Sequence, residues 1–396
     1  MNTECAHWHA PGSSERSSRP ALYQSERATP LSVAHPHLRD YVVLEILREV
    51  GMRRTLTTTL CALFFCVGVS AQDHTIIALS HSDFTAYEVD PTTGDILNQF
   101  TAADQPHEGV VSPDGHNLFV AIPLNHPSVV ILDPQTFEEK GRIESPYFHR
   151  SPDIRPYGDQ TITNTSALPH GVALNSDGTK LYIGVEWAEV PGLVVYDVTQ
   201  GRVTNKIELL LEGGHFFAVD HRTDKLYYPH RDDDRVVVLD TTTDDILKVI
   251  DVEGGPVGVD FTPDGEAWIH SDYNGTVTVI DMEKDEVVQV IDTGGSGPGR
   301  IAVSPDGRYA ASTRGETKDV AIIDVQRRAV VTRVSLGAGP GFPLFSPDGK
   351  KLYVMNSREA DIVVIDLESM EEEARYPVGV DPFGGTLRHR VVGASR

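Results

Sequence analysis

Three histidines stand in short polar motifs (Pro-His-Glu, Pro-His-Gly and Gly-His-Phe) at His107, His170 and His215. Each lies eleven residues before an apolar residue of a predicted strand, and these apolar residues are Leu118, Leu181 and Leu226. The constant spacing predicts that the three side chains occupy one structural position in three consecutive repeats. Three imidazoles that converge and leave one coordination position open suit Zn²⁺ or Cu. We therefore expect these histidines to hold a transition metal ion.

Further polar residues fall in loops that the repeat places on the same face. His230 and His270 end predicted strands there and, with Tyr157, are candidate acid–base groups. We expect substrate contacts from the remaining polar and aromatic side chains of that face, which are His81, His126, His149, Arg150, Arg155, Glu186 and Trp187. Two alternatives stay open: a metal-free histidine site that binds or converts a substrate, and histidines that only hydrogen-bond the backbone.

An insertion at residues 145–168 interrupts the repeats on that face. Its aromatic residues, prolines and two arginines predict a partly ordered lid beside His107 and His170, because long loops in compact repeats are usually functional or disordered. Arg150 and Arg155 can hold a carboxylate or a phosphate. The alternative is a surface loop that contacts a neighbouring subunit.

A recurring apolar run that ends in aspartate organises the whole chain. It ends at seven positions: Asp90, Asp133, Asp197, Asp240, Asp281, Asp324 and Asp366. They are separated by 43, 64, 43, 41, 43 and 42 positions. One unit of about 42 residues therefore explains every interval except the one that holds the insertion. The side chain of each such aspartate can hold the turn that follows it.

Each unit contains four short β-rich runs joined by turns such as residues 262–265 (TPDG). Four antiparallel strands repeated radially are typical of a β-propeller. We expect an all-β, seven-bladed β-propeller over residues 72–396. The chain begins at a second strand, so residues 381–387 near the C-terminus should supply the missing first strand, close the ring and cover an exposed edge.

Segments 346–350 (SPDGK), 351–356 (KLYVMN) and 361–366 (DIVVID) resemble the YVTN-type β-propeller repeat of surface-layer-like and lactonase-like proteins. The resemblance covers residues 75–388 and implies the same seven-bladed fold. Such propellers include binding proteins, lactonases, lyases and redox subunits, so the resemblance implies no single activity.

The segment from Met52 to Ala71 has the pattern of a secretory signal peptide. Two arginines precede an apolar run, which ends in small residues before Gln72. We predict cleavage near Ala71 and a periplasmic or secreted protein. Residues 1–51 are interpreted as a non-native or disordered extension. Cleavage removes all three cysteines, so metal ligands in the mature chain must be histidine, carboxylate or water.

The charge balance narrows the function further. The 396 residues carry 34 Lys and Arg against 58 Asp and Glu, a formal net charge of −24. This excess of acidic residues argues against nucleic-acid binding, which needs clustered basic residues. We expect no membrane span in the mature chain, and a small molecule or another exported protein as partner.

The leading hypothesis is an exported propeller whose histidine-rich face binds a metal and acts on or holds a small molecule. The alternatives are a non-catalytic ligand- or protein-binding module, and a lactonase- or lyase-like enzyme that uses histidine as acid and base.

Overall fold

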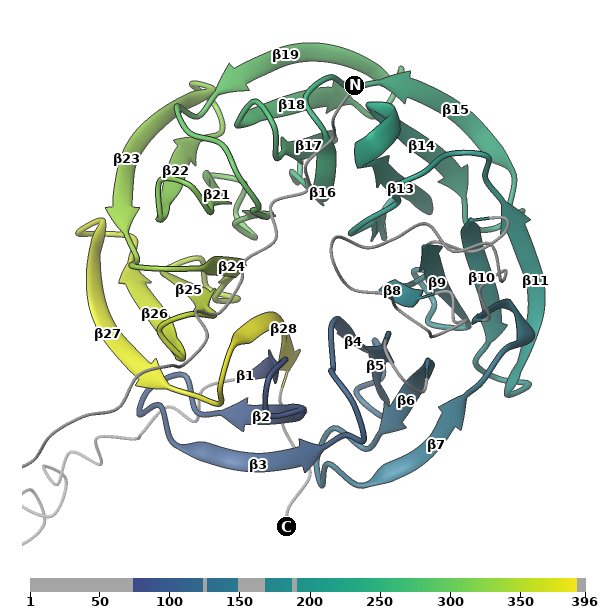
Figure 1. The fold of residues 1–396 in the computed structure, drawn as a ribbon. Helices are drawn as coiled ribbons and strands as arrows, with labels where there is room; N and C mark the ends of the chain where they lie inside the picture. The colour runs from purple at the N-terminus through teal and green to yellow at the C-terminus, as the bar shows by residue number, and fades with distance from the viewer. Residues whose placement is uncertain (1–73, 124–126, 149–167, 187–190, 390–396) are drawn as a thin grey trace, which may run out of the picture. The chain divides into compact units, whose positions relative to one another are not determined.

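The predicted repeats form seven four-stranded antiparallel sheets in the part of the chain that the structure describes. The structure is a computed structural model, and it describes residues 74–123, 127–148, 168–186 and 191–389. Figure 1 shows the sheets as blades around a common centre, each with one strand at the middle and one at the rim. The predicted seven-bladed β-propeller is confirmed.

Three predicted segments lie wholly or mostly outside the described residues. They are the extension 1–51, the signal peptide 52–71 and the insertion 145–168. At the start of the insertion, the 3-10 helix η2 (Pro146–Phe148) is described. Within the described ranges, no helix has the length and apolar character needed to cross a membrane.

Every blade is ordered from its innermost strand to its rim strand. The first four blades are β28 (Pro382–His389), β1 (His74–Ser80), β2 (Thr85–Val89) and β3 (Ile96–Thr101); β4 (Gly109–Val111), β5 (Leu118–Ile122), β6 (Ser128–Leu132) and β7 (Glu139–Ile143); β8 (Leu168–Leu174), β9 (Lys180–Glu186), β10 (Gly192–Asp197) and β11 (Arg202–Glu208); and β12 (Ala218–Asp220), β13 (Lys225–His230), β14 (Arg235–Asp240) and β15 (Ile246–Asp251). The 3-10 helix η3 (Arg231–Asp233) joins β13 to β14.

The remaining three blades repeat this order. They are β16 (Pro256–Phe261), β17 (Glu266–Ser271), β18 (Thr276–Asp281) and β19 (Glu286–Asp292); β20 (Ile301–Val303), β21 (Tyr309–Arg314), β22 (Asp319–Asp324) and β23 (Ala329–Ser335); and β24 (Pro340–Phe345), β25 (Lys351–Asn356), β26 (Asp361–Asp366) and β27 (Glu371–Pro377).

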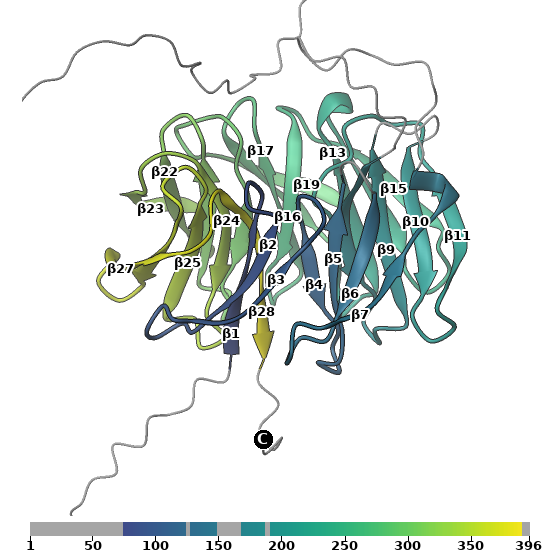
Figure 2. The same ribbon diagram turned by 60° about the horizontal axis from the view of Figure 1, so that its bottom comes forward.

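The C-terminal strand closes the ring as predicted. β28 pairs antiparallel with β1, from His74 opposite His389 to Ser80 opposite Pro382. Figure 2 shows the two strands side by side although they lie at opposite ends of the described chain. A first blade built from both ends leaves no unpaired inner edge on β1.

The seven repeated aspartates hold their turns, which explains why the spacing is so regular. Oδ1 of Asp133 accepts a hydrogen bond from the amide of Gln135 at 2.8 Å, and each of the other six aspartates accepts one from an amide two or three residues later. Short side chains that bond the backbone ahead of them favour tight turns. The turn between third and fourth strands is therefore set locally in every blade.

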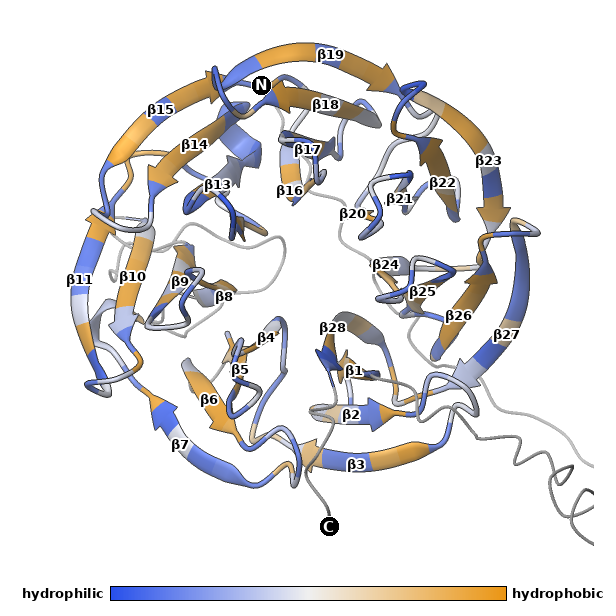
Figure 3. Cartoon of the chain, turned by 180° about the vertical axis from the view of Figure 1, so that it is seen from behind, coloured by the Kyte–Doolittle hydropathy of each residue, from blue (hydrophilic) through white to orange (hydrophobic). Residues whose placement is uncertain are grey.

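The hydrophobic core lies between neighbouring blades. One cluster joins Phe119 and Val129 of the second blade to Leu181, Ile183 and Val194 of the third. In Figure 3 the third strands, such as β10, β14 and β18, are largely hydrophobic, whereas the rim strands β7, β11 and β27 carry long hydrophilic stretches. Each blade thus buries both faces against its neighbours and exposes its rim to water.

Candidate functional site

His107 and His215 occupy equivalent positions at the start of the innermost strands. The amide of His107 donates to the carbonyl of Ala121 at 2.9 Å, and that of His215 donates to the carbonyl of Pro229 at 3.0 Å. Ala121 and Pro229 each lie three residues after the matched leucine of the second strand. His170 lies within β8, the innermost strand of the blade between them. The repeat therefore carries three imidazoles to the same end of the channel.

The three rings lie next to one another, and the carboxylate of Glu186 lies against two of them, His170 and His215. His107 Nε2 and His170 Nε2 are 3.1 Å apart. Glu186 Oε1 lies 3.3 Å from His170 Nδ1 and 2.8 Å from His215 Nδ1. Glu186 is the last residue of β9, the second strand of its blade. The carboxylate therefore comes from a second strand, whereas the histidines lie in or just before innermost strands.

Several polar atoms of this cluster are buried and have no hydrogen-bond partner. They include His107 Nδ1, Glu108 Oε1, His170 Nδ1 and Glu186 Oε1. The short contact between the carboxylate and the imidazoles is therefore not an aligned hydrogen bond. Unpartnered buried polar atoms cost on the order of 1–3 kcal/mol each, so such a cluster favours a bound cation or another ligand.

The potential metal ligands form two overlapping groups among the described residues. One group is His107, Glu108 and His170, and the other is His170, Glu186 and His215; within each, one ligand atom per residue lies within 4.8 Å of the others. His170 is common to both groups, while His107 and His215 fall in different ones. The structure thus places the three predicted ligands side by side, with His170 in the middle.

Burial favours the neutral form of His107 and His215, which is the form in which an imidazole can bind a cation. Desolvation lowers the pKa of His215 despite the opposing effect of Glu186, and it lowers the pKa of His107 well below the usual range. Burial on its own raises the pKa of Glu186, but His215 and His170 together outweigh it and hold that pKa well below its usual range. Glu108 differs, because desolvation raises its pKa well above the usual range.

His215 is bonded on both ring nitrogens. Its Nδ1 lies 3.3 Å from the carbonyl oxygen of Gly213, and its Nε2 lies 3.2 Å from Nη1 of Arg231. A guanidinium only donates, so Nε2 accepts and the proton sits on Nδ1 in this arrangement. Arg231 also pairs with Asp232, 3.1 Å away.

His81, a predicted substrate contact, lies beside the cluster. Its ring stacks on His107 with centroids 4.7 Å apart, and its buried Nε2 has no hydrogen-bond partner. Desolvation, with smaller contributions from His170 and Arg300, lowers the pKa of His81 to about 3. This ring is neutral at physiological pH.

The two predicted acid–base histidines differ from each other. His230 is buried with neither ring nitrogen bonded, and desolvation lowers its pKa to about 4. His270 instead lies 2.9 Å from Ser312 Oγ through Nδ1 and 3.2 Å from Asp272 Oδ1 through Nε2. His270 therefore has a hydrogen-bond partner at Nδ1 only, because its contact with Asp272 is not a hydrogen bond, and it lies outside both groups of potential ligands.

Six predicted site residues lie outside the described residues: His126, His149, Arg150, Arg155, Tyr157 and Trp187. Their roles stay predictions.

Four residues of the cluster's surroundings were missed by the sequence reasoning: Glu108, Phe216, Arg231 and Arg300. A signal for three of them exists in the repeat. Glu108, Phe216 and Arg300 each stand one position after the repeat position of the histidines, as does Phe342. The position directly after that of the histidines, compared across the repeats, therefore identifies a second set of side chains at the centre of the propeller. Arg231 had no such signal, because it belongs to a charged loop.

The comparisons with known proteins support the fold. No family model matches the chain. Two uncharacterized proteins named YncE, from Salmonella typhimurium and Salmonella typhi, are 24% and 23% identical over 261 residues, which are 56% of this chain and 72% of each of them.

Solved structures of similar shape come from proteins of different kinds. A functionally unknown protein from Desulfotomaculum acetoxidans has a TM-score of 0.66 at 13% identity, and the likeness covers 80% of this chain and 99% of that one. The periplasmic gluconolactonase PpgL of Pseudomonas aeruginosa has a TM-score of 0.62 at 18% identity, with coverage of 80% and 99%. Hydrazine synthase of Kuenenia stuttgartiensis has 0.58 at 20%, with coverage of 72% and 96%. The chain is thus a seven-bladed β-propeller with YncE-like and gluconolactonase-like neighbours, and at these identities the likeness shows the fold alone.

Proposed function

We propose that the protein is an exported β-propeller that binds Zn²⁺ or Cu²⁺ through His170, His215 and Glu186, and acts on or holds a small molecule at that ion. The observation that carries the proposal is the position of Glu186 Oε1, 2.8 Å from His215 Nδ1 and 3.3 Å from His170 Nδ1. Ligand atoms about 2 Å from one tetrahedral ion are themselves about 3.3 Å apart. Two imidazoles and one carboxylate leave one position open, as in catalytic rather than structural zinc sites.

His107 fits an orienting role better than that of a ligand. If His170 binds the ion through Nδ1, its Nε2 carries the proton and can donate to His107 Nε2, 3.1 Å away. A metal-bound imidazole usually donates its second N–H to a fixed acceptor, which holds the ring in place. His107 Nδ1 then carries a proton on the side of Glu108, whose Oε1 is 4.0 Å away.

Coordination by His215 requires Arg231 to turn aside. Once Nδ1 binds the ion, Nε2 must carry the proton and can no longer accept a hydrogen bond from Arg231. The guanidinium already contacts Asp232, so it keeps a carboxylate partner after this rotation. After this rotation the guanidinium of Arg231 could bind an anionic substrate group.

The ion would supply a Lewis acid that polarises a substrate oxygen or activates water. His230, which is buried and neutral and directly precedes Arg231, is available to move a proton. Export rests on the predicted signal peptide at residues 52–71.

The proposal is tested by measuring metal in the protein purified after export. We expect near-stoichiometric Zn or Cu by elemental analysis, or one binding event by calorimetry after chelator treatment. His170→Ala should abolish binding because His170 belongs to both ligand groups. His107→Ala should weaken it by roughly 10- to 100-fold, the usual effect of losing an orienting partner.

His116→Ala is the matched control, because His116 lies in an exposed turn between β4 and β5 and should leave the metal content unchanged. Thermal unfolding of every variant separates loss of metal from loss of fold. A wild-type protein that stays metal-free after incubation with both ions contradicts the proposal and favours a non-catalytic binding module.

A further inference from the structure

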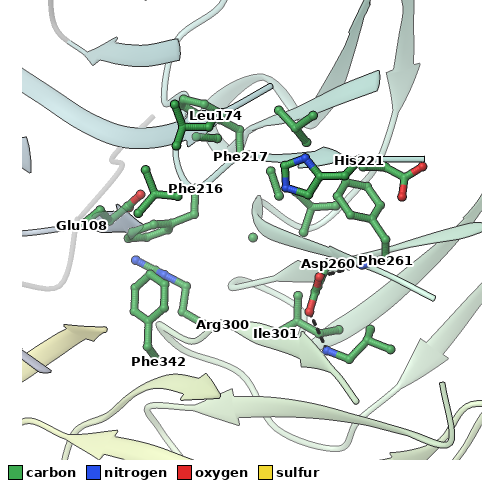
Figure 4. Close-up of a pocket in the computed structure, with 18 of the residues that line it drawn as sticks. Glu108, Leu174, Phe216, Phe217, His221, Asp260, Phe261, Arg300, Ile301 and Phe342 are labelled. Carbon is green, nitrogen blue, oxygen red and sulfur yellow. Dashed lines mark hydrogen bonds between the residues drawn. The ribbon is translucent and has the colours of Figure 1, made fainter. Parts of the chain in front are cut away.

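An open cavity of about 660 Å³ lies at the centre of the propeller. Its lining draws on the innermost strand of every blade, from β4 to β28. At one end it reaches Phe216, Arg300 and Phe342 (Figure 4), and the ring centre of Phe216 lies 5.1 Å from that of His170 in the histidine cluster. At the other end it reaches turns of the opposite face, at His221 and Pro263. The volume is that of a small-molecule pocket, which typically measures about 300–1,000 Å³.

Arg300 is a buried cation at the end of this cavity that lies next to the histidine cluster. Only 6% of the residue is exposed, and its guanidinium carbon lies 3.2 Å from the ring centre of Phe216. Figure 4 shows the guanidinium between the rings of Phe216 and Phe342. Its Nη1 donates to the carbonyl of Gly299 at 2.6 Å, and its Nε has no hydrogen-bond partner.

No carboxylate of the described residues lies within ion-pairing distance of Arg300, whereas other buried or cavity-lining arginines are paired. Arg314, fully buried, pairs with Asp319 at 2.5 Å. Arg222, which lines the same cavity, pairs with Asp220 at 2.8 Å. A buried charge without a counter-charge is costly, and it persists where a ligand supplies that charge.

The acidic groups of the lining do not neutralise Arg300. Asp260 Oδ2 accepts from the amide of Val303 at 2.7 Å, and its Oδ1 accepts from the amide of Phe261 at 2.9 Å. Glu108 also lines the cavity, and its buried Oε1 has no hydrogen-bond partner. The guanidinium is therefore a cation without an ion pair in a cavity whose walls include apolar side chains such as Phe217 and Val259.

We propose that the central cavity binds a small organic monocarboxylate, with its carboxylate on Arg300 and its apolar body against Phe217 and Val259. A planar guanidinium matches the two oxygens of a carboxylate, and stacking on Phe216 holds that plane in place. A monoanion fits better than a phosphate dianion, because the carboxylate of Asp260 lines the same space and would repel a second negative charge. The inference does not depend on a bound metal.

The test measures binding of benzoate and 3-phenylpropionate, and of their uncharged amides, to the chelator-treated protein by calorimetry. We expect the acids to bind at least about tenfold more tightly than the amides, because only the acids pair with the buried cation. Arg300→Gln should remove this preference. Arg222→Gln is the matched control, since Arg222 lines the cavity but already has a carboxylate partner, and it should retain the preference.

Two further variants keep the test decisive if Arg300→Gln does not fold. Val259→Trp fills the cavity and leaves Arg300 in place, so it should abolish binding of acids and amides alike. Arg300→Lys keeps the charge and loses the fork, so it should weaken binding of the acids only. Equal binding of acids and amides, unchanged binding in Val259→Trp, or no binding of either acid at millimolar concentration would overturn the inference. Metal content, measured in parallel, shows whether the metal proposal stands or fails separately.

Discussion

Asp260 illustrates how burial sets the charge of a single side chain in the channel. Desolvation raises its pKa to about 6, although hydrogen bonds from two backbone amides to its oxygens act in the opposite direction. In the unfolded chain the carboxyl returns to its ordinary pKa near 3.8. Because the folded pKa is the higher one, Asp260 contributes stability fully below about pH 4 and loses that contribution as the pH rises through 6.

We predict that Asp260→Asn removes this pH dependence. Relative to the variant, the wild-type protein should lose up to about 3 kcal/mol of unfolding free energy between pH 4 and pH 7. The measurement is the difference in unfolding free energy between the two proteins at several pH values, from urea titrations. Asp264→Asn, in the exposed turn that follows β16, serves as control. A wild-type-minus-variant difference that stays constant from pH 4 to pH 7 would show that folding does not raise the pKa of Asp260.

At the scale of the element, the turn after the third strand is the repeated unit that builds each blade. In the fourth blade, Asp240 Oδ1 accepts from the amide of Thr242 at 2.7 Å and from its hydroxyl at 2.5 Å. The amide of Asp244 donates back to the carbonyl of Asp240 at 2.8 Å, and Asp244 has a positive φ of 66°. One side chain therefore fixes the reversal between β14 and β15.

We predict that Asp240→Ala destabilises the protein by about 1–2 kcal/mol, because it removes at least two hydrogen bonds from a turn without a substitute. Chemical unfolding of the whole protein measures this difference. Asp251→Ala changes the charge equally but removes only an exposed pair with Arg235, so it should cost less than about 0.5 kcal/mol. Equal effects of the two changes would mean that charge, and not the turn, determines the stability.

At the scale of the whole molecule, a buried ion pair reinforces the closure of the ring. Glu88 in β2 is almost fully buried and contacts Arg388 of the C-terminal strand β28. The same carboxylate accepts from Thr75 Oγ1 at 2.8 Å and from Asn98 Nδ2 at 2.5 Å. Segments from both ends of the described chain thus meet at one side chain.

We predict that Arg388→Met lowers the unfolding free energy by about 3 kcal/mol, because it leaves Glu88 buried without its cation. Adding Glu88→Gln to this variant should restore part of the loss, since the buried charge is then gone. Lys350→Met, which removes an exposed pair with Asp348, is the control and should change little. If Arg388→Met behaves like this control, the ring is held by the β1–β28 pairing alone.

Most of the fold could be read from local patterns. The aspartate spacing predicted seven blades because each aspartate bonds its own turn, and that interaction spans only a few residues. The missing first strand was found because a blade with three strands leaves an edge that another segment must cover. The equivalence of His107 and His215 followed from the same register and is confirmed by their matching backbone bonds.

The composition of the site could be predicted only in part. Sequence spacing brought three imidazoles to one end of the channel and singled out Glu186 as a neighbour, but as a substrate contact. That Glu186 lies between His170 and His215 depends on how two blades pack, which no single repeat contains. Arg231 meets His215 within one blade, from a loop whose charges look like those of a solvated surface.

Residue spacing alone was enough to determine the number of blades, the closing strand and the end of the channel at which the histidines gather, because these follow from hydrogen bonds within a repeat. Tertiary structure decided which atoms face one another there and which charges lack a partner. Arg300 shows the difference most clearly: the repeat places it at the centre, but it becomes a buried, unpaired cation only when the innermost strands surround it with Phe216 and Phe342. Burial and long-range packing, and not local pattern, set the chemistry of the centre.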